Sequence, residues 1–284
     1  MEWRGNRSSG NVEDRRGATA GGIGGLGLVG TLVVLGVGYF FGIDISPIVG
    51  AIEQGQQQSQ PADPSQLSPE QREAGEFVSV VLGSTEDVWK TALPEQAGVQ
   101  YRDPSLVLYS GAVQSACGGA SAAMGPFYCP NDQKVYLDTS FFAQMQQKMD
   151  AGGEFAFSYV IAHEIGHHIQ NLIGVLPKVT QMRQQSGEEE SNQLSVLTEL
   201  QADCFAGVWG KTAGPTLKIT QTDFNDAINA AGAVGDDRLM EQAGRAPMPD
   251  SFTHGSSADR QKWFARGYES GDMRQCDTFG QAGI

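Results

Sequence analysis

Positive charge is scarce in this sequence of 284 residues: 19 Lys and Arg stand against 33 Asp and Glu, a formal net charge of -14. Binding to nucleic acid needs a basic surface, so this composition argues against that class of function. Histidine and cysteine are also rare, with four residues of each. Hydrophobic residues make up 40% of the chain, which is enough for a folded core and argues against a wholly disordered protein.

Charged residues are absent from Gly17 to Ile43, a run of 27 residues. As a helix this run would extend about 40 Å, more than the roughly 30 Å hydrocarbon core of a bilayer, so we expect one transmembrane helix. The alternative is a cleaved signal peptide. Glu13 and Asp14 lie in the region before the run, and no convincing small-x-small cleavage site follows it, which favours a retained anchor.

Basic residues flank the run on one side only. Arg4, Arg7, Arg15 and Arg16 precede it, and the next basic residue is Arg72. The positive-inside rule therefore predicts a single-pass protein of the cell membrane with a cytoplasmic N-terminus. The segment from Glu53 to Glu70 is polar and proline-containing, which is typical of a flexible tether. The expected parts are a cytoplasmic N-terminus (1–16), a transmembrane helix (17–43), a tether (44–70) and an extracytoplasmic domain (71–284).

The four cysteines are consistent with an oxidising compartment. Cys117 and Cys129 flank a short segment that can form a hairpin, which leaves Cys204 and Cys276 for each other. The alternative is four buried free thiols, which a cytosolic location would favour. The expected topology favours the two disulfides.

The globular part shows a mixture of helical and strand patterns, with helices prevailing. Strands are expected at Ser105–Tyr109, Ala122–Cys129 and Lys134–Leu137. An edge strand that includes Gly125–Tyr128 is a candidate for binding an extended substrate. The sequence thus predicts an α+β domain with a mainly helical core and a small sheet. Helices are expected at Glu76–Leu82, at Thr85–Leu93 with Thr85 as the N-cap, from Thr139 to about Met149, after Gly153, at Ser191–Trp209, from Asp223, and within Ser251–Tyr268.

The helix expected after Gly153 carries the motif His163-Glu164-Ile165-Gly166-His167. Positions four apart share one face of a helix, so both imidazoles can reach one metal ion. Neutral imidazole suits Zn²⁺, and Glu164 can act on a water beside the metal. The alternative is two core histidines without a metal. His168 lies about 100° around the helix and is expected to be a hydrogen-bonded core residue instead.

Two histidines leave a zinc site short of a protein ligand. Position 173 is Ile, so the third histidine of the metzincin motif is absent. Glu199 is the candidate, because it lies 32 residues beyond His167, enough for a loop and a returning helix. Asp203 is one turn further along and can accept the spare N–H of a ligand histidine. Glu188, Glu189 and Glu190 are the competing carboxylates, but they form a polar run typical of a solvated segment.

Four stretches carry a family resemblance: CGGASAAMGPFYCPNDQKVYLD, YVIAHEIGHHIQNLIG, ELQADCFAGVW and FTHGSSADRQKWFARGYESGD. They resemble, in the same order and over most of residues 77–278, the neutral zinc metallopeptidase family of bacterial membrane-anchored proteins. The resemblance implies a zincin-like fold and a zinc-dependent hydrolase, without a substrate.

The chain is also similar to gluzincins of the prenyl-protease and heat-shock membrane-protease type. In those proteins a His followed six residues later by an Arg comes after the E-x-x-A-D motif, and His254 and Arg260 stand in these positions here. The resemblance implies that His254 helps to stabilise the oxyanion and that Arg260 pairs with and orients Glu199. Gly255 departs from the relatives, which usually have Pro.

The sequence predicts a membrane-anchored zinc peptidase acting on a peptide or protein. One Zn²⁺ per chain is expected on His163, His167 and Glu199, with Glu164 as the general base. One alternative is a non-catalytic, zinc-stabilised binding or scaffold protein of the cell envelope. The other is a zinc amidase acting on a cell-wall substrate.

Overall fold

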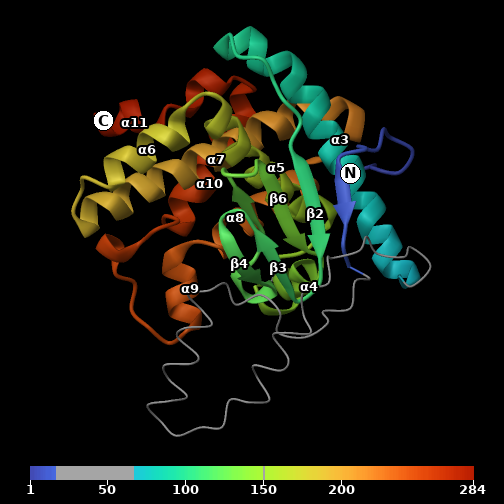
Figure 1. Ribbon diagram of the computed structural model, residues 1–284, viewed down its shortest axis with the longest axis horizontal. Helices are drawn as coiled ribbons and strands as arrows, with labels where there is room; N and C mark the ends of the chain where they lie inside the picture. Colours follow the sequence, from blue (N-terminus) through green and yellow to red (C-terminus); the bar gives the residue numbers. More distant parts are fainter. Residues whose placement is uncertain (17–66, 150) are drawn as a thin grey trace, which may run out of the picture.

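The computed structural model describes residues 1–16, 67–149 and 151–284 (Figure 1). The expected transmembrane helix at 17–43 and nearly all of the expected tether lie outside these residues. Among the helices that are described, none is both long enough and apolar enough to cross a membrane. The described residues form a mixed α+β structure that is mostly helical, which confirms the expected fold class in its general form.

A four-stranded sheet has the order β1-β2-β6-β5. The first three strands in this order are parallel, and β5 pairs antiparallel with β6 at the edge. A separate hairpin of β3 and β4 follows β2. The strands are β1 (Val12–Asp14), β2 (Ser105–Tyr109), β3 (Ala112–Ser115), β4 (Gly118–Ser121), β5 (Phe127–Cys129) and β6 (Lys134–Asp138). The expected strand at Ala122–Cys129 is therefore shorter, because Ala122–Met124 is a 3₁₀ turn.

Long helices surround this small sheet, and α5 and α7 cross next to each other near the centre of the molecule (Figure 1). The helices are α3 (Pro69–Ala97), α4 (Ser140–Lys148), α5 (Glu154–Leu172), α6 (Val175–Arg183), α7 (Glu188–Leu217), α8 (Gln221–Ala233), α9 (Asp236–Gln242), α10 (Ser257–Ser270) and α11 (Thr278–Ala282). Short 3₁₀ turns are η2 (Ala122–Met124), η3 (Pro249–Ser251) and η4 (Met273–Cys276).

Helix α3 is one continuous helix, where the sequence suggested two. Ser68 begins it with a capping box: its side chain accepts from the backbone of Gln71, whose side chain accepts from the backbone of Ser68. Thr85, expected to be an N-cap, is buried and donates to the carbonyl of Leu82. The Thr85 hydroxyl therefore bonds to the backbone of the preceding turn of α3 and does not cap the start of a second helix.

Residues 1–16 pack against the domain from which we expected a membrane to separate them. β1 extends the sheet in parallel with β2, and Trp3 is 2% exposed within the main hydrophobic core. The indole of Trp3 contacts Phe77 edge to face and donates to Glu154 at 2.7 Å. Residues 1–16 thus contribute a strand and a core side chain to the same structure as the residues that follow position 66.

Small residues allow the helices that build the site to approach closely. A Cβ atom on Gly166 of α5 would lie 2.9 Å from the carbonyl oxygen of Ala202 on α7. One on Gly267 of α10 would lie 1.9 Å from the carbonyl oxygen of Cys204, also on α7. Glycine at these two positions therefore lets both α5 and α10 rest against the backbone of α7.

Both expected disulfides are present, Cys117–Cys129 and Cys204–Cys276. The first links the β3–β4 turn to the end of β5, and the second links α7 to η4 after α10. Disulfides persist in oxidising compartments, so the two bonds indicate an extracytoplasmic domain.

Candidate metal centre

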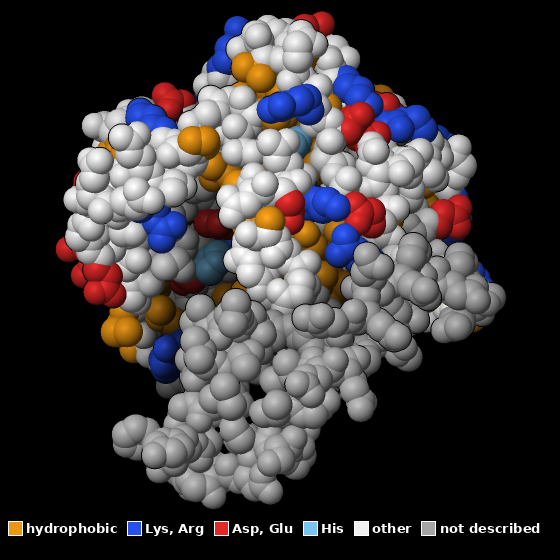
Figure 2. All heavy atoms as spheres, viewed as in Figure 1, with side chains coloured by type: hydrophobic (Ala, Val, Ile, Leu, Met, Phe, Trp, Pro, Cys, Tyr) orange, Lys and Arg blue, Asp and Glu red, His pale blue; other side chains and the backbone are white. Residues whose placement is uncertain are grey.

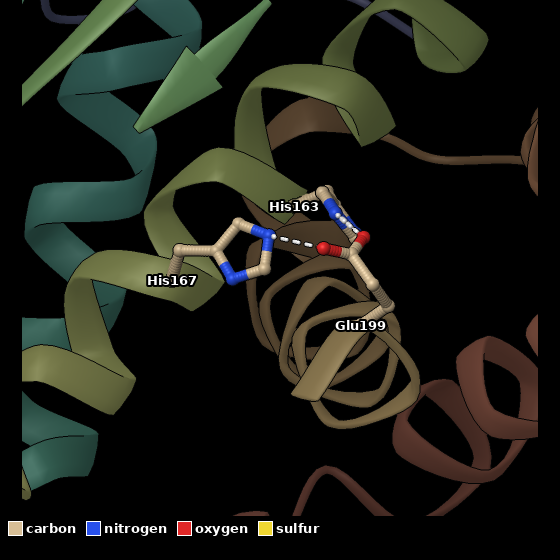
Figure 3. A group of neighbouring side chains, drawn as sticks. All are labelled: His163, His167 and Glu199. Carbon is tan, nitrogen blue, oxygen red and sulfur yellow. Dashed lines mark hydrogen bonds and ion pairs between the residues drawn. The ribbon is translucent and has the colours of Figure 1, made fainter. Parts of the chain in front are cut away.

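Three side chains expected to bind zinc converge from two helices (Figure 3). His163 and His167 come from α5 and Glu199 from α7, and their ligand atoms all lie within 4.8 Å of one another. Nε2 of His163 is 3.1 Å from one carboxylate oxygen of Glu199, and Nε2 of His167 is 3.4 Å from the other. Two imidazoles and a carboxylate are the ligand set of many catalytic zinc sites, so these residues fit Zn²⁺.

The helical period explains why the two histidines meet. Their rings are 4.8 Å apart and nearly perpendicular, as expected for positions four apart on one helical face. Among the residues that the structure describes, no other group of three or more His, Cys, Asp or Glu side chains is arranged to hold a metal. The competing run Glu188–Glu190 is exposed in the first turn of α7, where negatively charged side chains stabilise the helix by interacting with its dipole.

Each candidate ligand histidine is held through its second ring nitrogen. Nδ1 of His163 lies 2.8 Å from Oδ1 of Asp203, as the sequence suggested. Nδ1 of His167 lies 2.9 Å from Oε1 of Gln170, which sequence reasoning missed although it sits three residues further along the same helix. Oxygen acceptors at both Nδ1 atoms favour the tautomers that leave both Nε2 lone pairs free for a metal.

Arg260 reaches the site from α10, but its main partner differs from the expected one. Its guanidinium binds Asp203 through two hydrogen bonds of 2.8 and 3.0 Å, while its nearest approach to Glu199 is 3.9 Å. Oδ1 of Asp203 also accepts from the hydroxyl of Tyr159 at 2.6 Å. Arg260 thus holds the carboxylate that orients His163 and contacts Glu199 only as a neighbouring charge.

Glu164 is buried beside the histidines with 7% of its surface exposed. Its Oε2 atom has no hydrogen-bond partner among the described residues. Burial raises the pKa of this carboxyl group, although the neighbouring His167 and His163 act in the opposite direction. A buried acceptor without a partner is costly in a stable fold, which indicates that a water or a substrate group completes it.

The charges of the three candidate ligands are strongly coupled. Burial alone would lower the pKa of His163, but Asp203 and Glu199 together raise it to about 10. Burial opposes the charge of Glu199, yet His167 and His163 hold the pKa of this carboxyl group well below its usual range. A metal cation can take the place of the protons that these histidines bind, so metal affinity is expected to increase with pH.

His254 lies before α10 and faces a cavity of about 310 Å³ that Glu199 also lines. The hydrogen bond to Asp236 raises the pKa of its imidazole most strongly, with burial acting in the opposite direction. Asp236 also accepts from the backbone N–H groups of Thr253, His254 and Gly255 at 2.6 to 3.0 Å. Sequence reasoning missed Asp236, which no motif marks and which only the fold brings to this loop.

His168 points away from the cluster, as expected. It is fully buried, with Nδ1 3.0 Å from the hydroxyl of Tyr128 and Nε2 2.7 Å from the carbonyl oxygen of Arg102. Burial lowers the pKa of its imidazole to about 4. This histidine therefore ties the motif helix α5 to the edge strand β5.

The sequence profile of one protein family, described as "Putative neutral zinc metallopeptidase", matches residues 1–279. The chain belongs to this family. A further similarity is to the uncharacterized protein YpfJ of Escherichia coli strain K12, which is 46% identical over 292 residues that cover 99% of this chain and all of that protein. Another is to the uncharacterized protein Rv2575 of Mycobacterium tuberculosis strain H37Rv, 44% identical over 227 residues, or 75% of this chain and 74% of that protein. No solved structure matches the chain.

Membership of the metallopeptidase family agrees with the geometry of the cluster. The match begins at residue 1, so the N-terminal strand β1 belongs to the shared pattern. It also spans His163, His167 and Glu199, the metal-ligand candidates. The family match and the tertiary structure therefore agree on the same three candidate metal ligands.

Proposed function

We propose that this protein is an extracytoplasmic zinc peptidase that hydrolyses peptide bonds, with Glu164 as the general base. The main support is that the buried Oε2 of Glu164 has no hydrogen-bond partner in the described part of the chain and lies beside a His163–His167–Glu199 cluster that fits zinc. A purely structural zinc site needs four ligands and no neighbouring base. The three-ligand cluster with an adjacent carboxylate favours catalysis over a scaffold role.

Zn²⁺ bound here would supply a Lewis acid that polarises the carbonyl group and lowers the pKa of water. Glu164 accepts a proton from the attacking water as its oxygen bonds to the carbonyl carbon. When the C–N bond breaks, the same carboxyl group passes the proton to the leaving nitrogen. Its raised pKa suits both steps, because the group has to bind a proton and release it again.

His254 is the candidate donor for the negative charge that develops on the carbonyl oxygen. Its ring is half-exposed in the cavity beside Glu199, and Asp236 favours the protonated form. Arg260 and Asp203 act through His163, holding its ring with Nε2 toward Glu199.

The edge strand β5 is the candidate for aligning the substrate. It borders the sheet on the side away from β1, and Tyr128 links it to His168 of the motif helix. A peptide in extended form can add to such an edge by main-chain hydrogen bonds. This arrangement favours an endopeptidase acting on unfolded or extended segments.

Proteome-wide cleavage profiling tests the function. The full chain is compared with Glu164→Gln, which keeps the size and polarity of the side chain, and with Glu189→Gln as an exposed control. We expect new peptide termini with the wild type and the control but not with Glu164→Gln. Zinc content is measured in all three proteins, and equal zinc with equal cleavage would refute the general-base role. Release of cell-wall amide fragments without peptide cleavage would identify an amidase instead.

A further inference from the structure

The cavity beside Glu199 and His254 is formed mainly by α6 and by the first half of α7 (Figure 2 shows the hollowed face with a histidine at its centre). Leu176 and Val179 supply apolar wall, and Arg183 stands at the end of α6. With about 310 Å³ next to the candidate ligand, this cavity is large enough for one side chain of a bound substrate.

Four hydroxyl groups line the cavity, and three of them are engaged within their own helix. Thr180 donates to Leu176, Ser195 to Ser191, and Thr198 to Leu194, all at backbone carbonyls four residues earlier. Their protons are therefore not offered to a ligand. The fourth hydroxyl, that of Thr253, lies 3.1 Å from Nδ1 of the neighbouring His254. Among the lining residues of α6 and α7, the remaining side-chain N–H donors belong to Arg183, while Thr253 and His254 line the cavity from the loop before α10.

Arg183 carries a permanent positive charge. Its Nε donates to the hydroxyl of Ser191 at 3.0 Å, and no carboxylate in the described part of the chain pairs with it. An arginine offers five donors, so its terminal N–H groups remain available. In a chain with a net charge of -14, the exposed guanidinium of Arg183 at the wall of the cavity favours the binding of anionic groups there.

We propose that this cavity is a subsite of the peptidase that binds a carboxylate of the substrate, with Arg183 as the residue that determines this specificity. The proposal rests on the proposed function. The carboxylate belongs either to an Asp or Glu side chain near the cleaved bond or to the C-terminus of a short peptide. Arg183 binds substrate and takes no part in proton transfer.

The test uses the full chain with zinc and four sets of quenched peptides: Asp or Glu against Asn or Gln near the cleaved bond, and free against amidated C-termini. Arg183→Glu is compared with Lys178→Glu, which makes the same charge change at an exposed position of α6. For the wild type and Lys178→Glu we expect kcat/KM to be at least about 10-fold higher for the carboxylate form. Arg183→Glu should abolish or reverse this preference, with the loss mainly in KM.

The four sets distinguish the source of the carboxylate. A preference confined to the Asp and Glu peptides assigns the side chain, and one confined to free C-termini assigns the terminal carboxylate. Equal rates for all peptides with the wild type, or a preference unchanged by Arg183→Glu, would overturn the subsite. No cleavage of any peptide by the zinc-loaded wild type would instead overturn the proposed function.

The N-terminal residues carry a second, independent inference. Met1 contributes its ammonium group to an ion pair of 2.6 Å with Asp223 of α8, and Glu2 pairs with Lys218 after α7. Further along, Arg16 is 6% exposed and donates to the carbonyl oxygen of Gln71 at 2.7 Å. Both ends of this segment are thus fastened to the domain that carries the metal site.

These contacts cannot form across a bilayer, whose hydrocarbon core is roughly 30 Å thick. β1 needs main-chain hydrogen bonds to β2, and the side chain of Trp3 needs its core position. We propose that residues 1–16 and 67–284 lie on the same side of the membrane and form one domain. This replaces the arrangement in which the N-terminus is cytoplasmic and the domain is outside.

Glu2 and Lys218 are adjacent and exposed, so cysteines at these positions test the proposal. In intact cells carrying the full chain, Glu2→Cys and Lys218→Cys should react with an impermeant thiol reagent from the same side. The double variant should be joined by a short bis-maleimide, detected as a retarded band. The matched control pairs Glu2→Cys with Lys178→Cys on α6, at the far side of the domain (Figure 1), and should not be joined. Labelling of Glu2→Cys and Lys218→Cys from opposite sides would overturn the proposal.

Discussion

Replacing Asp203 by Asn should weaken zinc binding without removing a ligand. The carboxylate accepts four hydrogen bonds: its Oδ1 from Tyr159, His163 and Arg260, and its Oδ2 from the Nε of Arg260. An amide keeps one acceptor oxygen and presents two donors on the other side. The best orientation keeps the oxygen toward His163, so the amide nitrogen faces the Nε of Arg260.

Two effects of this change have different sizes. Loss of the negative charge leaves the buried Arg260 without a carboxylate in hydrogen-bond contact, since Glu199 lies 3.9 Å away, so the free energy of unfolding should fall by about 3–5 kcal/mol. Poorer orientation and basicity of His163 should weaken zinc affinity by about 10–100-fold. The loss of stability that follows from breaking a buried charge pair therefore has to be measured separately from the loss of zinc affinity.

Zinc affinity is measured by competition with a chelator, and stability by denaturant unfolding of the metal-free protein. Asp138→Asn is the matched control, because Asp138 is also buried and accepts backbone N–H bonds from Gly111 and Ser140, outside the metal cluster. The control should lose stability and keep its zinc affinity. A folded Asp203→Asn protein that binds zinc as tightly as the wild type would refute the reasoning.

Three further predictions follow from the same geometry. Glu164→Gln should retain zinc, measured by metal analysis, and lower kcat by about 10²–10⁴-fold; undiminished turnover would contradict its role. Asp236→Asn should lower the raised pKa of His254. Because the ring loses its proton as pH rises through that pKa, the fall of kcat on the alkaline side of the pH profile should move to lower pH. An unchanged pH profile would exclude His254 as the charged donor. Replacing Cys204 and Cys276 together by Ser should lower the free energy of unfolding by about 4 kcal/mol, the chain-entropy cost of a 72-residue loop, as measured by denaturant titration; no change would show that the bond contributes nothing.

The sequence by itself determined the part of the site that depends on local periodicity. His163 and His167 meet because positions four apart share a helical face, whatever surrounds them. Glu199 and Asp203 repeat this spacing on a second helix, so placing one of them near the metal brings the other near the first histidine. The parity and spacing of the four cysteines likewise gave both disulfides without a structure.

Which side chains pair with each other depended on the tertiary structure, because the sequence around a residue does not distinguish between partners that are distant along the chain. Arg260 is 57 residues beyond Asp203 and 61 beyond Glu199, and only the close packing of α10 on α7 decides that Asp203 receives the bidentate contact. Asp236 and His254 are likewise brought together only by the fold, in which the start of α9 lies against the loop before α10. Residues 1–16 are the largest case: their charge suggested a cytoplasmic tail, and long-range burial of Trp3 and pairing of β1 made them part of the domain. Such contacts have no local signature, since they depend on surfaces that exist only once the chain has folded.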